Sequence, residues 1–390
     1  APWDDYSESI RSVNISDGIT SLGDNSFCGC TNLTSVTFPG TVKEIWDKTF
    51  ANCTSLKSIT IPDGITGIYY LAFYKCTGLE SVILPDSVQE IGYCVFTGCK
   101  NLKNITMSKN ITYIDESAFD GCSSLTSITI PGGVKRMGWG AFRGCTSLKS
   151  IDFQNGVEVI SDYAFENCTG LTSISIPGSV SSLDSTAFAG CTNLTQLSVS
   201  GANRTYHSAG NCIIDTQNKA LVIGCSSSVI PSDGSVTSIS YGAFEGCTGL
   251  TSITIPNSVK SIEGEAFGYC TGLTSVIIPN GVTSIEGNLF AGCSNLKSVS
   301  IPTGVTLIGS GAFFECDSLT DIVIPNGVIS IEYAAFQGCT GLTSLSIPES
   351  VTSIGRQAFN GCIGLTSLRI PNGVTSISEA AFSGCSGLSW

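Results

Sequence analysis

Hydrophobic residues return along this chain at a fixed interval of 23 positions, and a phenylalanine marks each return. Fifteen copies keep this register, with one break. The marking residues are Phe27, Phe50, Phe73, Phe96, Phe119, Phe142, Phe165, Phe188, Phe244, Phe267, Phe290, Phe313, Phe336, Phe359 and Phe382. A period of this length predicts stacked units, each of which buries its apolar face only against its neighbours. The pattern therefore predicts a solenoid.

The copy that begins at Phe244 shows what one coil contains. Leu250–Ile255 ends in alternating apolar and polar residues, which predicts a short strand with its isoleucines buried. Pro256 ends this strand because it has no N–H to donate. A second short extended piece is predicted at Val259–Ile262, and a helical or 3-10 turn at Ala266-Phe267.

The spacing Leu-x-x-Ile-x-Ile-Pro, followed by Val-x-x-Ile and Ala-Phe-x-Gly-Cys, resembles the BspA-like class of leucine-rich repeat. This class occurs in surface proteins of bacteria and some parasitic protists, and the resemblance covers almost the whole chain. It implies a β-rich α/β-type repeat solenoid, a right-handed superhelix with a parallel concave sheet, short second strands and short helical or 3-10 turns. It also implies an extracellular or cell-surface protein with an adhesive role, which is an analogy because folds do not determine functions.

We divide the predicted solenoid into four consecutive segments. Residues 1–26 form a partial N-terminal coil and cap, residues 27–195 a first repeat arm, residues 196–240 an island, and residues 241–390 a second arm. In the island, two apolar runs flank a polar turn at Thr216–Lys219, which predicts a β-hairpin. It is either a functional insertion or an irregular coil. A four-residue loop would bring Cys212 opposite Cys225, where the two could bridge.

Composition narrows the range of partners. The formal net charge of −13 makes a nucleic-acid partner unfavourable, because phosphates require clustered Lys and Arg. No apolar run reaches the roughly 18 residues of a membrane-spanning helix. We therefore expect neither nucleic-acid binding nor membrane insertion, and we expect a monomer.

Cysteine is the most unusual feature of the composition, with nineteen residues. Fifteen of them follow the repeat phenylalanine by three positions, which leaves Cys28, Cys94, Cys212 and Cys225. A cysteine at one fixed place in every coil is best explained as a small buried residue with a weak S–H donor. A linear cysteine ladder does not converge on one point as zinc ligands must. We predict free thiols, no metal site and no cofactor.

Aromatic residues gather at the corner before the phenylalanine turn in the first arm. The predicted partner-binding residues there are Trp46, Tyr69, Tyr70, Tyr93 and Trp139, with Tyr206 and His207 in the island. Equivalent corners of adjacent coils lie side by side, so these rings could stack on sugars or anchor a protein partner. The alternative is that they cover apolar surface along the side of the stack.

His207 is the single histidine, so it decides the enzyme hypothesis. A nucleophilic pair would have to join His207 to Cys212, with Asp215 as the nearby carboxylate that orients the imidazole. A hairpin is a poor place to fix three groups, and we predict no catalytic residues. We expect a protein that binds proteins or glycans of host or neighbouring cells, or alternatively a passive spacer that presents another domain.

Overall fold

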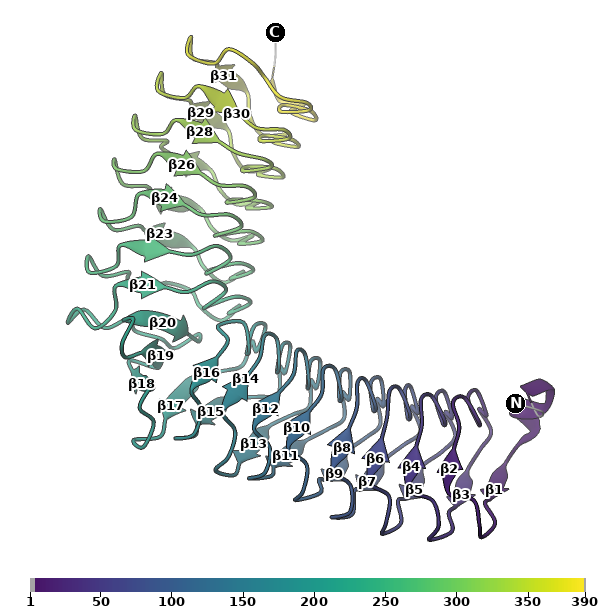
Figure 1. The fold of residues 1–390 in the computed structure, drawn as a ribbon. Coiled ribbons are helices and arrows are strands. Elements are labelled where there is room, and N and C mark those ends of the chain that lie inside the picture. Colours follow the sequence, from purple (N-terminus) through teal and green to yellow (C-terminus); the bar gives the residue numbers. More distant parts are fainter. Residues whose placement is uncertain (1–3, 389–390) are drawn as a thin grey trace. The chain divides into compact units, whose positions relative to one another are not determined.

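The computed structural model describes residues 4–388 (Figure 1). The chain divides into two compact units, which we describe separately. Unit 1 comprises residues 1–191 and 199–204, and unit 2 comprises residues 192–198 and 205–390. Residues 1–3 of the predicted cap and residues 389–390 lie outside the described part of the chain.

Unit 1 is a stack of coils that each contribute one longer and one shorter strand. It begins with the 3-10 helix η1 (Asp4–Ser9). The longer strands are β1 (Ser12–Asn14), β3 (Ser35–Thr37), β5 (Ser58–Thr60), β7 (Ser81–Ile83), β9 (Asn104–Thr106), β11 (Ser127–Ile130), β13 (Ser150–Phe153) and β15 (Ser173–Ile176). The shorter strands are β2 (Ser21–Leu22), β4 (Glu44–Ile45), β6 (Gly67–Ile68), β8 (Glu90–Ile91), β10 (Tyr113–Ile114), β12 (Arg136–Met137), β14 (Val159–Ile160) and β16 (Ser182–Leu183). Strand β17 (Gln196–Val199) lies where the two units divide.

Unit 2 opens with a five-stranded sheet in the order β18-β19-β20-β21-β22. These strands are β18 (Tyr206–Ala209), β19 (Cys212–Asp215), β20 (Ala220–Ile223), β21 (Ser238–Ile239) and β22 (Ser261–Ile262). Longer strands follow at β23 (Ser275–Ile277), β25 (Ser298–Ser300), β27 (Asp321–Ile322), β29 (Ser344–Ser346) and β31 (Ser367–Arg369). The shorter strands are β24 (Ser284–Ile285), β26 (Leu307–Ile308), β28 (Ser330–Ile331) and β30 (Ser353–Ile354).

Neighbouring coils pair in parallel, with partners 23 residues apart. Ser58 pairs with Ser81, for example, and in unit 2 Ser275 pairs with Ser298. The sequence period is thus the register of the ladder, and the parallel solenoid predicted from it is confirmed. The buried residues of each strand alternate with exposed serine or threonine, as in β5 and β7.

The phenylalanine turns differ from the sequence expectation. Apart from η1, residues 4–388 contain no helix, and Phe50 lies in a hydrogen-bonded turn. Lys48 and Asn52 flank it with φ of 54° and 61°, in the left-handed region. This alternation lets the N–H groups of Lys48, Phe50 and Asn52 donate to the carbonyl oxygens of Tyr70, Ala72 and Tyr74 in the next coil. A helix would direct these N–H groups along its own axis instead.

The predicted strand at Ile253–Ile255 is also absent. Ile255 is buried and Ile253 half-buried, so the apolar alternation is retained. However, residues 251–256 have no strand assignment, and β20 to β22 pair on the other side of the coil. A strand needs a neighbour at the matching position, and the ten residues beyond two full periods between Phe188 and Phe244 offset the coil that would supply it.

The core of each unit is a column of phenylalanine rings. Phe119, Phe142 and Phe165 stack with ring centroids 5.1 and 5.3 Å apart and interplanar angles of 7° and 5°. Unit 2 continues the same arrangement, with Phe336 and Phe359 at 5.3 Å. Offset stacking adds to the burial of these large side chains.

A second column runs beside the first and is made of thiols. The Sγ–H of Cys99 donates to the carbonyl oxygen of Phe73 at 3.1 Å, and this contact recurs from coil to coil. All nineteen cysteines are free, which confirms the prediction of unbridged thiols. Burial raises the pKa of Cys99 and Cys293 to about 12, so these groups stay protonated at neutral pH.

Thiol reactivity should report this burial. At about pH 8, close to the pKa of an unperturbed thiol, we expect fast reaction with a disulfide reagent only at the half-buried Cys28, Cys94, Cys247 and Cys385. All nineteen cysteines should react in denaturant without a reductant. Fast reaction of most thiols in the native protein, or a much lower count in denaturant, would contradict this arrangement.

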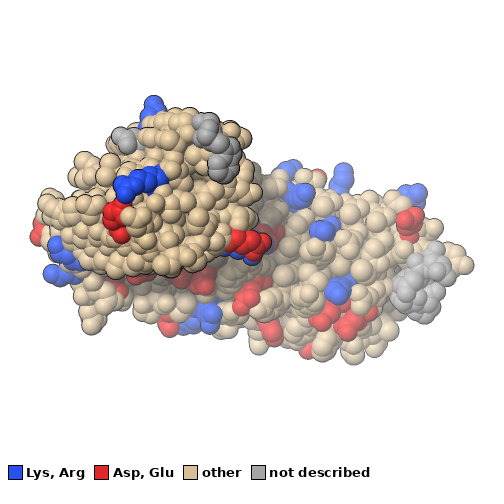
Figure 2. Space-filling view, turned by 90° about the horizontal axis from the view of Figure 1, so that it is seen from above, with Lys and Arg blue, Asp and Glu red and all other residues tan. Residues whose placement is uncertain are grey.

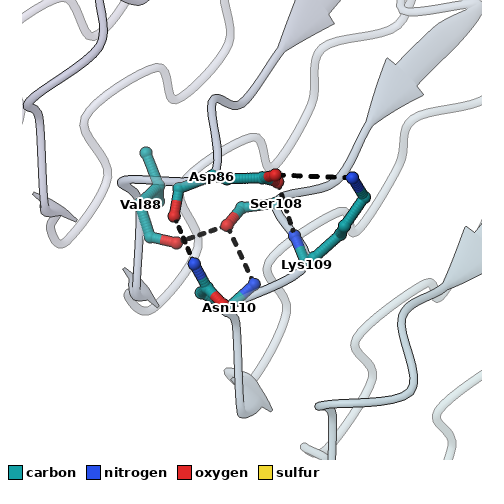
Figure 3. A network of polar contacts seen from close by, with 5 residues as sticks. All are labelled: Asp86, Val88, Ser108, Lys109 and Asn110. Atoms are coloured by element: carbon teal, nitrogen blue, oxygen red, sulfur yellow. Dashed lines mark hydrogen bonds and ion pairs between the residues drawn. The ribbon is translucent and has the colours of Figure 1, made fainter.

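The corner after each longer strand is held by polar contacts where proline is missing. Ser108 stands where Pro85 and Pro131 stand in the adjacent coils. Figure 3 shows its buried hydroxyl, which donates to the carbonyl oxygen of Val88 at 2.6 Å. The N–H of Lys109 donates to the Asp86 carboxylate at 3.1 Å, and the Asn110 amide donates to the Asp86 carbonyl at 2.7 Å. These bonds between neighbouring coils hold the corner together.

The surface carries few charged side chains. Figure 2 shows Lys, Arg, Asp and Glu scattered over a surface made mostly of other residues, as the 13% of charged residues implies. Within the described residues, no helix is both long enough and apolar enough to cross a membrane.

Candidate functional site

The predicted aromatic residues of unit 1 lie on the turn segment that follows each shorter strand. Trp46 comes directly after β4, Tyr69 and Tyr70 after β6, and Trp139 two residues after β12. Because successive coils superimpose with a 23-residue offset, these positions lie at one corner of the stack. We call Trp46, Tyr69, Tyr70, Tyr93 and Trp139 the aromatic strip. The exposed fractions are 40% for Trp46, 43% for Tyr70, 42% for Tyr93 and 37% for Trp139.

Trp46 and Tyr69 form the tightest contact within the strip. Their ring centroids are 4.9 Å apart. The Tyr69 hydroxyl donates to Oε1 of Glu44 at 3.1 Å, and burial together with this carboxylate raises the Tyr69 pKa. The Tyr69 ring also covers Gly67 of β6, where an added Cβ would collide with it. Tyr69 therefore covers backbone, as the alternative reading of the strip expected, while Trp46 remains exposed.

Lysine and arginine side chains hold the other rings. The Lys48 ammonium lies 5.7 Å from the centroid of Tyr70, and the Arg143 guanidinium lies 4.7 Å from that of Trp139. Arg143 is itself fixed by two hydrogen bonds to the carboxylate of Asp120, at 2.6 and 3.2 Å. Such contacts reduce the rotamer freedom that a side chain loses on binding a partner.

Tyr93 is oriented by a carboxylate of the next coil. A hydrogen bond to Glu116 raises the Tyr93 pKa to about 12. Glu116 occupies the equivalent turn position between Tyr93 and Trp139, so an acidic residue interrupts the row of rings. The strip thus combines aromatic faces with both signs of charge.

The island residues are arranged differently from the strip. Strand β18 pairs antiparallel with β19, and β19 with β20, so the expected hairpin is present with a third strand that sequence reasoning missed. Tyr206 is only 7% exposed, so its ring packs inside unit 2 instead of facing a partner. His207 is half-buried, and its Nδ1 lies 2.9 Å from the Thr216 hydroxyl oxygen.

Cys212 does not form a nucleophilic pair with His207. In the antiparallel register His207 lies opposite Ile214, and the Cys212 thiol is directed to the carbonyl oxygen of Gly210 at 3.5 Å. Burial raises the Cys212 pKa to about 12, the opposite of what activates a thiol. A register shift between Ile213 and Ile214 also moves Cys212 out of line with Cys225, and both thiols are free. Among the described residues, no three His, Cys, Asp or Glu side chains cluster as a metal site would require.

Sequence reasoning missed a groove of about 780 Å³ on the turn face of unit 2. Tyr241, Tyr269 and Tyr333 line it, and all three are exposed. The available signal was one of spacing. Tyr241 and Tyr333 both precede their phenylalanine by three residues, whereas Gly264 and Gly287 hold this position in the intervening coils. The groove thus arises from small residues between large ones.

Parallel ladders of two strands per coil, with a repeated apolar column, define a leucine-rich repeat solenoid. The sequence profile of the family described as "BspA type Leucine rich repeat region (6 copies)" matches residues 5–126, 66–195, 112–217, 218–342 and 308–389. The chain belongs to the BspA-type leucine-rich repeat family. Comparison with curated proteins gives no match.

Several crystal structures are similar to this chain. A leucine-rich cell surface protein from Faecalibacterium prausnitzii is 30% identical, with 97% of this chain and 86% of that chain covered and a TM-score of 0.56. A leucine-rich repeat protein from Bacteroides ovatus is 31% identical, with coverage of 93% and 88% and a TM-score of 0.56. One from Eubacterium ventriosum has a TM-score of 0.66 at 22% identity, with coverage of 85% and 83%, and shows the same fold.

Proposed function

We propose that this chain is a non-catalytic, secreted or cell-surface protein that mediates adhesion by binding proteins or glycans of host or neighbouring cells. The observation that carries the proposal is the aromatic strip, in which Trp46, Tyr70, Tyr93 and Trp139 remain exposed while neighbouring side chains hold them. Rigid exposed aromatic rings are the side chains that most often dominate binding energy. The extracellular location is supported by the similarity to the cell surface protein of Faecalibacterium prausnitzii.

The binding partner is expected to act without a cofactor or a chemical step by this chain. The net charge of −13 disfavours nucleic acid, and the strip offers ring faces and charged groups at one corner of the stack. Such a surface suits a sugar ring, which stacks on aromatic faces, or a protein loop with polar and apolar side chains. We expect the protein to act as a monomer.

The double substitution Trp46→Ala with Trp139→Ala should weaken binding about tenfold or more, because both rings would contact the partner. The full chain would first be tested on a glycan array and a panel of extracellular-matrix proteins. Affinity for each hit would then be compared between native and double-variant proteins by biolayer interferometry. The melting temperature should remain close to native, because both side chains are exposed.

The matched control is Tyr6→Ala, which removes an exposed ring that lies outside the strip. It should bind as the native chain does. Equal affinity of the native protein and the double variant would exclude the strip as the binding surface. A native chain that binds none of the probes would favour the alternative function, a passive spacer, which the low charge and the serine- and threonine-rich strand faces also suit.

A further inference from the structure

The groove of unit 2 is formed by a gap in the pattern of large side chains. It extends over five coils, from the turn at Phe244 to the turn at Phe336. Tyr241 and Tyr333 stand at its ends, and Gly264 and Gly287 form part of its floor. At the strand spacing of about 4.8 Å, five coils span roughly 20 Å, the length of about six extended residues. Its volume of about 780 Å³ is in the range of ligand sites.

Tyr269 supplies the most informative side chain of the groove. It is 54% exposed, and its ring lies over Gly292 in the next coil, where an added Cβ would collide with it. Its φ is 56°, at a turn position where glycine stands in the coils on either side, Gly246 and Gly292. A bulky residue in this left-handed conformation costs about 1–2 kcal/mol. Strain of this kind gathers at functional sites.

The polar groups of the groove carry negative charge. Glu245 and Glu265 contribute carboxylates, and the Asn288 amide donates to Oε1 of Glu265 at 3.0 Å, which orients that carboxylate. The described lining contains no Lys or Arg. Unit 2 as a whole has five Lys and Arg against twelve Asp and Glu. An acidic field favours the approach of a cation and disfavours an anion.

The aromatic and acidic groups are complementary to the same kind of ligand. A guanidinium or ammonium group is attracted to the face of a tyrosine ring and to a carboxylate. In unit 1 the chain supplies this partner itself, with Lys48 over Tyr70 and Arg143 over Trp139. In the groove the cation must come from another molecule.

We propose that the groove binds an extended, arginine- or lysine-rich segment of a partner protein. About six residues lie along the five coils, with cationic side chains against Tyr269 and Tyr333 and near Glu265. This site is separate from the aromatic strip and does not depend on the function proposed for it.

One turn position allows a charge test without a new backbone. Ser310 lines the groove three residues before its phenylalanine, and later coils hold Arg356 and Glu379 at the same position. Ser310→Arg and Ser310→Glu therefore place side chains of comparable reach where the fold already accepts them. If the ligand is cationic, the arginine variant loses binding by repulsion and the glutamate variant keeps it.

The probes are a fluorescein-labelled hexapeptide of alternating Arg and Gly, its Glu and Gly counterpart, and a neutral glucose hexasaccharide. With the full chain, we expect the arginine peptide to bind and the other two not to bind. Ser310→Arg should raise its Kd about fivefold or more, and Ser310→Glu should not raise it. Affinity should fall between about 50 and 300 mM salt, because screening weakens charge pairing.

Tyr269→Gly is the second variant. It removes the ring and restores the residue found at this position in adjacent coils, so the melting temperature should not fall while the Kd rises about fivefold. The Trp46→Ala and Trp139→Ala protein should bind the peptide as the native chain does, so a failure of the strip is distinguishable from a failure of the groove. No binding of the arginine peptide, equal binding by Ser310→Arg, or tighter binding of the hexasaccharide would overturn the proposal.

Discussion

Substitution of Phe142 by alanine should lower the free energy of unfolding by about 3–5 kcal/mol, the largest effect expected of any single core residue. Phe142 is completely buried and stacks on rings on both sides, Phe119 at 5.1 Å and Phe165 at 5.3 Å. The substitution leaves a cavity in the column that joins each coil to the next. Because a solenoid is stabilised by contacts between neighbours, the loss should also separate unfolding into two steps.

Urea unfolding followed by circular dichroism would measure this change. Phe27→Ala is the matched control in the same unit, since Phe27 occupies the equivalent position but is only half-buried. It should cost about 1–2 kcal/mol, in proportion to the smaller burial. If both variants unfolded at the same urea concentration, the ring column would not be the main source of stability.

The second large effect is expected at Gly224, where the island meets the first ring of unit 2. A Cβ added at Gly224 would overlap the ring of Phe244, so the bare backbone of the segment after β20 packs flat on that ring. The N–H of Gly224 also donates to the Ala243 carbonyl at 2.7 Å. Gly224→Val should therefore destabilise unit 2 by about 3 kcal/mol through overpacking.

Gly201→Val is the control for this substitution. Gly201 is exposed, has no neighbour within 4 Å of an added Cβ, and should tolerate valine within about 0.5 kcal/mol. Thermal unfolding of both variants would compare the two positions. A Gly224→Val protein as stable as the native chain would mean that the island does not close the end of this ring column.

The repeat made the core predictable. Phe50, Cys53, Leu56, Ile59 and their equivalents recur every 23 residues because they point inward, and each of these four is buried. The strand register followed from the same interval. The free thiols were predictable for the same reason, since a fixed place in every coil requires one environment.

Features that depend on backbone bonds between coils were not predictable in this way. The turn at Phe50 adopts left-handed residues because its N–H groups bond to the next coil, a preference that local helix propensity does not contain. The register shift at Ile213 that separates Cys212 from Cys225 is likewise a property of the folded sheet. Residues 251–255 lost their strand because the coil before them is offset, although their own sequence matches the repeat.

The two candidate surfaces differ in how far the sequence revealed them. The strip consists of large residues close together in the repeat, such as Trp46 and Tyr69, so a search for clustered aromatics finds it. The groove depends on Gly264 and Gly287, and on Tyr241 and Tyr333 four coils apart. It becomes visible only when equivalent positions are aligned as the fold aligns them.

The 23-residue offset of every bond between coils has an evolutionary consequence. Lys48 bonds to Tyr70, and Leu71 in the next coil bonds to Tyr93, through the same backbone atoms. Unequal recombination between two copies that removes or adds 23 residues therefore joins surfaces that already match. Gene length can drift by whole coils while the hydrogen-bond pattern is preserved, so the reach of such a protein can change faster than its architecture.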